Sequence, residues 1–390
     1  MIDYEMSIPT RVIYGPGRHK EIGQRLKKYT TQVLFIYGGG SIRRSGLYDS
    51  ITAALNSAGI QWKELAGVHA NPTIEKVNEG IELCRIYNIR FLLAAGGGSV
   101  IDTAKSIAVG ADYNGDVWDF YTGKAGIDHA MPIATILTVP GTGSEVSVNA
   151  ILTNEKTKEK RGILNDCLRP VFSILDPELC KTLPPRQISN GVYDMFCHTF
   201  ERYMSRTEHT DVVDGIGEGI MKAILKNGPV AYHDPTNLDA MGELMVASDF
   251  SHNMITGFGR KADWSCHGME EVISGLYDIP HGAGLSVLVP GWMRYVYKKH
   301  IDVFTRFAAN VMGVQTAGRN ADEIIEESIQ GLENFSRTLG LPLRLSELGV
   351  DDSKFEYMAQ LACSYKQDGR VGRLEPLDQQ DIVHIYQSVL

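Results

Sequence analysis

The chain has 390 residues, of which 43% are hydrophobic and 22% are charged, and it carries a net charge of −9 with a pI near 5.7. This acidic balance argues against nucleic acid or an anionic membrane surface as a partner. The sequence has neither a basic and apolar signal segment nor an apolar run of about 18 residues, so we expect neither secretion nor a transmembrane helix.

The length of the chain favours two domains, because a single hydrophobic core rarely grows beyond roughly 250–300 residues. Its six cysteines are scattered and include no Cys-x-x-Cys pair. This pattern indicates reduced thiols rather than disulfides or a zinc ribbon, and it predicts a cytoplasmic protein.

The first half of the chain alternates apolar runs with segments of helical period. Residues 32–37 and 89–95 are predicted strands, and each is followed by Gly-Gly-Gly-Ser and a helix. Residues 132–140 form another apolar run, which ends in the glycine-rich stretch 141–147. Strands that alternate with helices predict a parallel sheet covered by helices.

The character of the sequence changes at Pro184 and Pro185, where a helix cannot easily continue. Beyond them helical periods dominate, over residues 192–205, 212–228, 238–256, 321–340 and 355–367. We therefore predict a fold of class α/β plus all-α. Residues 1–185 are expected to form an α/β domain, and residues 186–390 an all-helical domain.

Glycine-rich turns follow the predicted strands. Glycines let a phosphate approach the backbone closely, and the start of the next helix favours an anion. Gly96 through Ser99 are therefore candidates for binding a pyrophosphate, with Asp102 either capping the helix or contacting a ligand. Thr138 and residues 141–144 occupy an equivalent position. These glycines could also be ordinary turns, and the pattern G-x-G-x-x-G is absent.

The first glycine turn bears on the choice of cofactor. NAD sites commonly place an acid on the ribose 2′-hydroxyl, whereas an arginine suits a 2′-phosphate. Between Val33 and Tyr48 there is no acid, but Arg43 and Arg44 are present. This favours NADP, with NAD as the alternative.

A metal site is the second prediction. Asp194 and His198 are one helical turn apart in an apolar segment, and His267 and His281 lie among small and apolar residues. One carboxylate and three imidazoles suit Zn²⁺ or Fe²⁺. Asp194 and His198 could instead be a helix-terminal acid and a core histidine. The other eight histidines are expected at the surface.

Several motifs, in this order, resemble the iron-containing (group III) alcohol dehydrogenases and most closely their butanol dehydrogenase branch. They are GGGSVIDTAK, PGTGSEVS, RPVFSILDPEL, GVYDMFCHTFERY, WSCHGMEE and GLYDIPHGAGLSVLVPGWM. The resemblance implies a dehydroquinate-synthase-like fold, in which residues 1–185 form a Rossmann-type dinucleotide-binding domain and residues 186–390 a helical domain for metal and substrate. It places the active site in a cleft between the two domains and implies a homodimer or larger assembly. It also implies a metal held by an Asp and three His, which match Asp194, His198, His267 and His281.

The resemblance extends to the cofactor site. The residues that it implies for NAD(P) are Gly38, Gly39, Gly40, Ser41, Asn71, Gly97, Gly98, Ser99, Asp102, Thr138, Ser147 and Lys160. Many relatives carry another histidine four residues after the third ligand, but this chain has Glu271 there. Glu271 is therefore a candidate catalytic residue that could relay protons, add a ligand or form a salt bridge elsewhere.

The implied reaction is hydride transfer between NAD(P)H and a short to medium-chain aldehyde such as butanal, aided by the metal. Trp264, Phe258 and Met254 are candidates to line an apolar substrate pocket, or to pack in the core. A dehydroquinate-synthase-like lyase or cyclase is an alternative, although residues 264–285 lack the Lys and Arg that an acidic substrate needs. A non-catalytic nucleotide-binding sensor is another.

Overall fold

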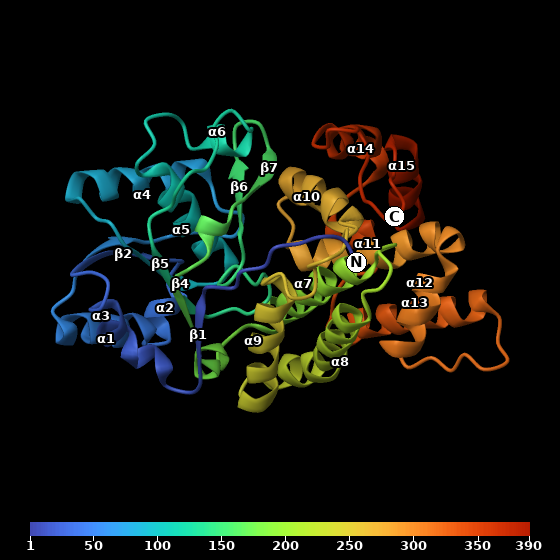
Figure 1. Cartoon of the computed structure of the whole chain (residues 1–390), viewed down its shortest axis with the longest axis horizontal. Coiled ribbons are helices and arrows are strands. Elements are labelled where there is room, and N and C mark those ends of the chain that lie inside the picture. Colours follow the sequence, from blue (N-terminus) through green and yellow to red (C-terminus); the bar gives the residue numbers. More distant parts are fainter. The chain divides into compact units, whose positions relative to one another are not determined.

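The computed structural model describes all residues, 1–390, and divides into two compact units (Figure 1). The sheet unit comprises Ser7–Pro184 and Pro235–Asp249, and the helical unit comprises Met1–Met6, Pro185–Asp234 and Phe250–Leu390. None of the helices combines the length and the apolar character needed to cross a membrane.

The sheet unit is built on six parallel strands in the order β1-β8-β5-β4-β2-β3. The strands are β1 (Arg11–Tyr14), β2 (Gln32–Tyr37), β3 (Gln61–Leu65), β4 (Leu92–Gly96), β5 (Ile133–Leu137) and β8 (Phe172–Leu175). In the register of β2 with β4, Leu34 lies opposite Leu92 and Tyr37 opposite Ala95. The central strands are almost entirely buried, as expected for apolar strands with helices on both faces. The predicted parallel sheet is confirmed.

Helices cover both faces of this sheet. Residues of α1 (Ile22–Leu26) and α3 (Leu47–Ala58) share a core cluster with Val33 and Phe35 of β2. The helices α4 (Ile74–Tyr87) and α5 (Gly98–Gly110) pack together against β2 and β4 on the other side (Figure 1). The remaining elements are η1 (Arg18–Glu21), α2 (Ser41–Arg44), α6 (Trp118–Tyr121), η2 (Asp166–Leu168), η3 (Pro177–Cys180) and the antiparallel pair β6 (Asn149–Asn154) and β7 (Glu159–Leu164).

The strand order creates a switch point between β2 and β4. These strands are neighbours, but the chain after β2 leads outward to β3, whereas the chain after β4 leads to β5 on the opposite side. In open parallel sheets, ligands bind at such a point, beyond the carboxyl ends of the strands. The two Gly-Gly-Gly-Ser turns directly follow these carboxyl ends.

The helical unit is built from long helices and contains no strand. Its helices are α7 (Pro185–Tyr203), α8 (Asp211–His233), α10 (Ser265–Tyr277), α11 (His281–Val296), α12 (Ile301–Asn310), α13 (Ala321–Thr338), α14 (Phe355–Ser364) and α15 (Gln379–Ser388), with short 3₁₀ turns η4 (Tyr297–Lys299), η5 (Leu345–Leu348) and η6 (Asp352–Lys354). A further helix, α9 (Leu238–His252), belongs to the sheet unit up to Asp249.

α11 is the central helix of the helical unit. It contacts α7, α10, α13 and α15, and every residue from Gly282 to Met293 is buried. A helix that is apolar on all sides is expected in the middle of a bundle. Because α11 begins at His281 and packs against α7 and α10, this arrangement brings His281 toward the other candidate ligands.

Candidate functional site

The four candidate ligands converge in the helical unit. Asp194 and His198 lie one turn apart on α7, His267 lies in the first turn of α10, and His281 is the first residue of α11. The Oδ1 atom of Asp194 is 3.5 Å from Nε2 of His198, 3.7 Å from Nε2 of His267 and 3.8 Å from Nε2 of His281. Three imidazole nitrogens thus surround one carboxylate oxygen.

The spacing of three of these groups fits a metal ion. Asp194, His267 and His281 offer ligand atoms that all lie within 4.8 Å of one another, whereas His198 lies 3.5 Å from Asp194 but falls outside this group. A tetrahedral ion with ligand bonds of about 2.0–2.2 Å places its ligand atoms roughly 3.3–3.6 Å apart. Asp194 Oδ1 and His267 Nε2 are buried, and neither has a hydrogen-bond partner in the protein. Such unpartnered groups are costly unless a cation satisfies them. The donor set therefore suits a divalent ion such as Zn²⁺ or Fe²⁺.

The carboxylates in and around the cluster favour a positive charge at its centre. Burial would raise the pKa of Asp194, but the electrostatic influence of the surrounding histidines His198, His281 and His267 holds it well below its ordinary value. Burial lowers the pKa of His198 far below its ordinary value, which keeps this imidazole neutral. For His267, burial is outweighed by the charges of Glu201 and Asp194, which raise its pKa to about 10.

Two buried glutamates contact the other nitrogens of these imidazoles. A Glu201 carboxylate oxygen is hydrogen-bonded to Nδ1 of His267, and a Glu270 carboxylate oxygen to Nδ1 of His281. Both glutamate side chains are fully buried. Glu201 also accepts the backbone N–H groups of Cys266, at 2.6 Å, and His267, at 3.3 Å. These N–H groups belong to the first turn of α10 and have no partner within the helix, so Glu201 also caps α10.

Trp264, Arg202 and His252 surround the cluster. Trp264 has φ = 66°, which places its ring edge-on to His267 with 5.1 Å between ring centroids. The Arg202 guanidinium stacks on Trp264 at 4.6 Å and donates to the carbonyl oxygens of His198 and Ser251. The His252 ring lies 4.1 Å from that of His198. Of the apolar candidates near the third ligand, Trp264 therefore lies beside the cluster.

The expectation that all other histidines lie at the surface is wrong for three of them. His19, His252 and His300 are each less than a tenth exposed. His19 is hydrogen-bonded to Asp176 at 2.6 Å, and His300 to Glu375 at 3.0 Å. The polar sequence neighbours of these histidines suggested exposure, but the carboxylates that pair with His19 and His300 come from distant segments.

Glu271 is half-buried and forms no hydrogen bond or ion pair with the cluster. Its neighbour Glu270 makes the contact instead. One residue along a helix turns a side chain by about 100°, so only one of the two glutamates faces His281.

In the sheet unit, two glycine turns meet at the switch point. Gly38, Gly39, Gly40 and Ser41 follow β2, while Gly97 is the N-cap of α5, and Gly98 and Ser99 open its first turn. The first backbone N–H groups of α5 are free of helical partners and favour an anion. The geometry therefore brings together two of the predicted cofactor segments.

Asp102 and Ser147 hold loops in place. Asp102 accepts a hydrogen bond from Ser144 Oγ at 2.5 Å and another from the backbone N–H of Ile151 at 3.2 Å. The buried Lys105 ammonium donates to the carbonyl oxygen of Ser147 at 2.9 Å and to its hydroxyl at 3.1 Å. These contacts join α5 to the segment after β5.

The remaining cofactor candidates, Thr138, Lys160 and Asn71, come from three separate segments of the sheet unit. Thr138 directly follows β5 and is half-buried, and Lys160 is a buried residue of β7. Asn71 has φ = 56° and lies two residues before Thr73, the N-cap of α4.

Arg43 forms an ion pair with Glu64, a residue of β3. Its guanidinium is 3.2 Å from a carboxylate oxygen of Glu64, donates to the hydroxyl of Tyr37 at 2.9 Å and stacks on the ring of Tyr48 at 3.8 Å. Glu64 also accepts the hydroxyls of Tyr37 and Tyr48. This acid lies outside residues 33–48, on which the predicted preference for NADP rests, and it comes close only because β3 lies beside β2 in the sheet.

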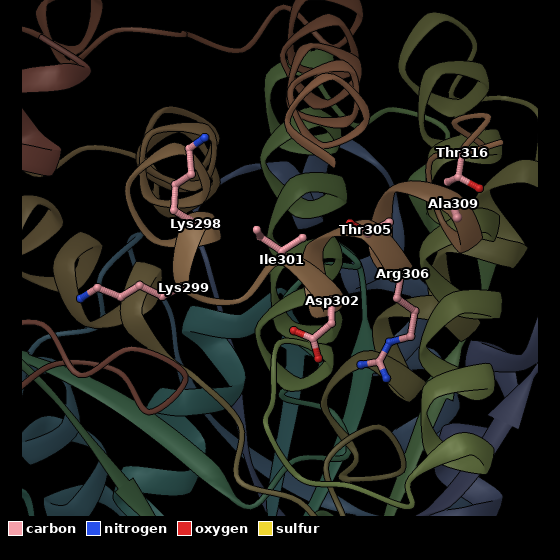
Figure 2. Close-up of a pocket in the computed structure, with 8 residues that line it drawn as sticks. All are labelled: Lys298, Lys299, Ile301, Asp302, Thr305, Arg306, Ala309 and Thr316. Carbon is pink, nitrogen blue, oxygen red and sulfur yellow. The ribbon is translucent and has the colours of Figure 1, made fainter. Parts of the chain in front are cut away.

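A separate hollow of about 680 Å³ lies over α12 (Figure 2). Its three basic side chains are already paired: Lys298 with Asp322, Lys299 with Glu375, and Arg306 with Asp214. None of the four candidate ligands lines it, so it is not part of the metal centre.

Comparisons with known proteins agree with this geometry. A family model described as iron-containing alcohol dehydrogenase matches residues 9–177, and a model of the C-terminal domain of the same family matches residues 188–390. The chain belongs to the iron-containing alcohol dehydrogenase family. It is therefore an oxidoreductase that acts on alcohols.

Relatives of this iron-containing alcohol dehydrogenase match along nearly the full chain. NADH-dependent butanol dehydrogenase A of Clostridium acetobutylicum is 41% identical, with all of both chains covered. NADPH-dependent aldehyde reductase YqhD of Escherichia coli is 34% identical, over 90% of this chain and 91% of that protein. The crystal structure of NADH-dependent butanol dehydrogenase A from Thermotoga maritima has a TM-score of 0.96 and 35% identity, and covers 100% of this chain and 99% of that one.

Proposed function

We propose that this alcohol dehydrogenase reduces short to medium-chain aldehydes such as butanal, with a nicotinamide cofactor as hydride donor and a divalent metal, Fe²⁺ or Zn²⁺, at Asp194, His198, His267 and His281. The observation that carries the proposal is the convergence of three Nε2 atoms on Asp194 Oδ1. The names of relatives at 34–41% identity support the substrate class and the cofactor.

The reaction divides the work between the two units. When bound, the ion supplies a Lewis acid for the aldehyde oxygen. Asp194 and the three imidazoles hold their donor atoms in place around it, and Trp264 excludes water from one side of His267. The switch-point turns and the N-terminus of α5 bind the cofactor's pyrophosphate. A proton reaches the product oxygen through water, a ribose hydroxyl or Glu271.

The proposal also includes a homodimeric assembly and a location in a reducing compartment. The family resemblance supports a homodimer. Six free cysteines, five of them buried, support a reducing compartment such as the cytoplasm.

The test of the proposed function is reconstitution. Metal-free protein is expected to be inactive with butanal, and loading with Fe²⁺ or Zn²⁺ is expected to restore oxidation of NADH or NADPH. Zinc-loaded and iron-loaded samples compared side by side also identify the working metal. Cofactor binding without turnover in every loaded sample, across several aldehydes, would refute the dehydrogenase and favour a nucleotide-binding sensor.

The Arg43–Glu64 contact changes the basis of the cofactor preference. The prediction of NADP relied on Arg43 and Arg44 as partners of a 2′-phosphate, but Glu64 partly neutralises Arg43 and adds a negative charge beside the first glycine turn. An acid at a neighbouring strand end suits the ribose 2′-hydroxyl. We therefore propose NADH as the preferred cofactor, in agreement with the name of the relative at 41% identity.

Replacing Glu64 by glutamine is expected to shift this preference toward NADPH. The change removes the negative charge and frees Arg43, so the ratio of kcat/KM for NADPH to that for NADH should rise about fivefold, the upper range for a partly exposed charge pair. Initial rates with both cofactors at saturating butanal measure it. Glu75→Gln, an exposed acid of the same unit, is the control. An unchanged ratio in Glu64→Gln would remove Glu64 from the selection of the cofactor.

A further inference from the structure

We propose that Glu270 and Glu201 are positioning residues of the metal centre, which orient the imidazoles of His281 and His267 so that their Nε2 atoms face Asp194. This inference rests on the proposed function, because it requires that the four groups bind an ion. It assigns a role to two buried carboxylates outside the ligand set.

The first step of the argument is the chemistry of the imidazole. A neutral imidazole carries one N–H, and the hydrogen-bond partner of one nitrogen decides which nitrogen keeps the proton. Glu270 and Glu201 accept from Nδ1 of His281 and His267. The nitrogen that faces an ion is then Nε2, and an ion that binds there takes the place of a proton on His267. These Nε2 atoms lie 3.7–3.8 Å from Asp194 Oδ1. Carboxylates that orient ligand histidines in this way raise metal affinity.

The second step is that Glu270 is itself fixed in place. The hydroxyl of Ser274, one turn later on α10, donates to its other carboxylate oxygen. On the facing helix, a Cβ atom at Gly284 would lie 2.5 Å from Glu270 Oε1 and 2.6 Å from its Cγ. Only glycine at position 284 leaves room for the carboxylate, so the packing of α11 against α10 fixes the position of the Glu270 side chain.

The third step is the connection between helices. On α7 the pair His198 and Glu201 has the spacing His-x-x-Glu, and on α10 the pair His267 and Glu270 repeats it. In neither case does the glutamate bind the histidine of its own motif. Glu201 holds the ligand of α10 and Glu270 holds the ligand of α11. A glutamate of α7 thereby sets the orientation of the ligand on α10, and a glutamate of α10 sets that of the ligand on α11.

The experiment measures metal affinity without relying on activity. Full-length protein is stripped of metal, and the Kd for Zn²⁺ is determined by competition with a chromophoric chelator; the absorption spectrum with Co²⁺ reports the geometry of the site. Glu270→Ala is expected to weaken binding of Zn²⁺ by about 10–100-fold. Glu270→Gln, which keeps an acceptor oxygen in place, should lose less. Glu145→Gln removes an equally buried carboxylate from the sheet unit and serves as the matched control.

The outcomes separate the two proposals. If the wild-type chain binds Zn²⁺ but both Glu270 variants bind it within about threefold of wild type, the positioning role fails and the metal centre stands. If the wild-type chain itself binds no metal, the proposed function fails. Should Glu270→Ala not fold, Gly284→Ala displaces the carboxylate without deleting it, and it is held to the same criterion as Glu270→Ala. The unfolding midpoints of the metal-free variants and wild type show separately whether a substitution lowers stability.

Discussion

His267→Ala is expected to lower kcat/KM for butanal by on the order of 10³-fold or more, because it removes a ligand itself, whereas removing a partner of a ligand already costs roughly 10–100-fold. It also leaves the buried Glu201 carboxylate without its imidazole partner and deprives Asp194 Oδ1 of a neighbour at 3.7 Å. Steady-state rates and the metal content of the dialysed protein measure the two effects together.

A matched control for this variant is His300→Ala. His300 is as buried as His267 and also contacts a glutamate, Glu375, but it lies outside the cluster. It should keep both metal and activity, although some stability will be lost with its hydrogen bond. A His267→Ala protein that retains a full complement of metal and a large part of its activity would contradict the assignment of this ligand.

Gly282→Ala is expected to damage stability and the metal centre together. A Cβ atom at Gly282 would lie 2.2 Å from the backbone oxygen of Asn190 on α7 and 2.8 Å from its carbonyl carbon. Backbone atoms cannot rotate away, so α7 and α11 must move apart. Overpacking of this kind costs about 1–3 kcal/mol, and sometimes more. Because His281 is the preceding residue, its Nε2 should move away from Asp194, and Zn²⁺ affinity should fall with the unfolding midpoint.

Gly219→Ala provides a control with the opposite expected sign. Gly219 is an exposed residue within α8, and a Cβ atom there would meet nothing within 4 Å. Alanine in an open helical position stabilises by about 0.5–1 kcal/mol relative to glycine. Urea unfolding of the two variants and the wild type measures the contrast. Equal stability of Gly282→Ala and wild type would mean that α7 and α11 are less closely packed than the structure has them.

The sequence predicted the architecture wherever local patterns were strong. Apolar runs at 32–37 and 89–95, each followed by glycines and a helical period, identify buried parallel strands, and β2 and most of β4 lie there. The pair β6–β7 was not predicted, because residues 149–164 mix polar and apolar residues without a clean alternation. Nor does any local pattern associate Met1–Met6 with the helical unit, where the backbone N–H of Ile2 bonds to Gly259.

The four side chains of the candidate site could be selected from the sequence, whereas the two buried glutamates beside them could not. Asp194, His198 and His267 are recognisable because ionisable groups in apolar segments need a partner. Glu201 and Glu270 carry no such signal, since a glutamate at the end of an apolar segment resembles an ordinary surface residue. The repeated spacing His-x-x-Glu was available in the sequence. Only the three-dimensional structure shows that each glutamate serves the ligand of another helix.

The three imidazoles differ in whether a hydrogen bond fixes the orientation of the ring. His267 and His281 are each anchored at Nδ1 by a buried carboxylate. Nδ1 of His198 has no hydrogen-bond partner in the protein, and its ring contacts the rings of His267, His252 and Trp264. It is the one imidazole of the three that can turn without breaking a hydrogen bond. If these histidines hold an ion, the ligand that is free to adjust lies on α7, and the ligands with fixed rings lie on α10 and α11.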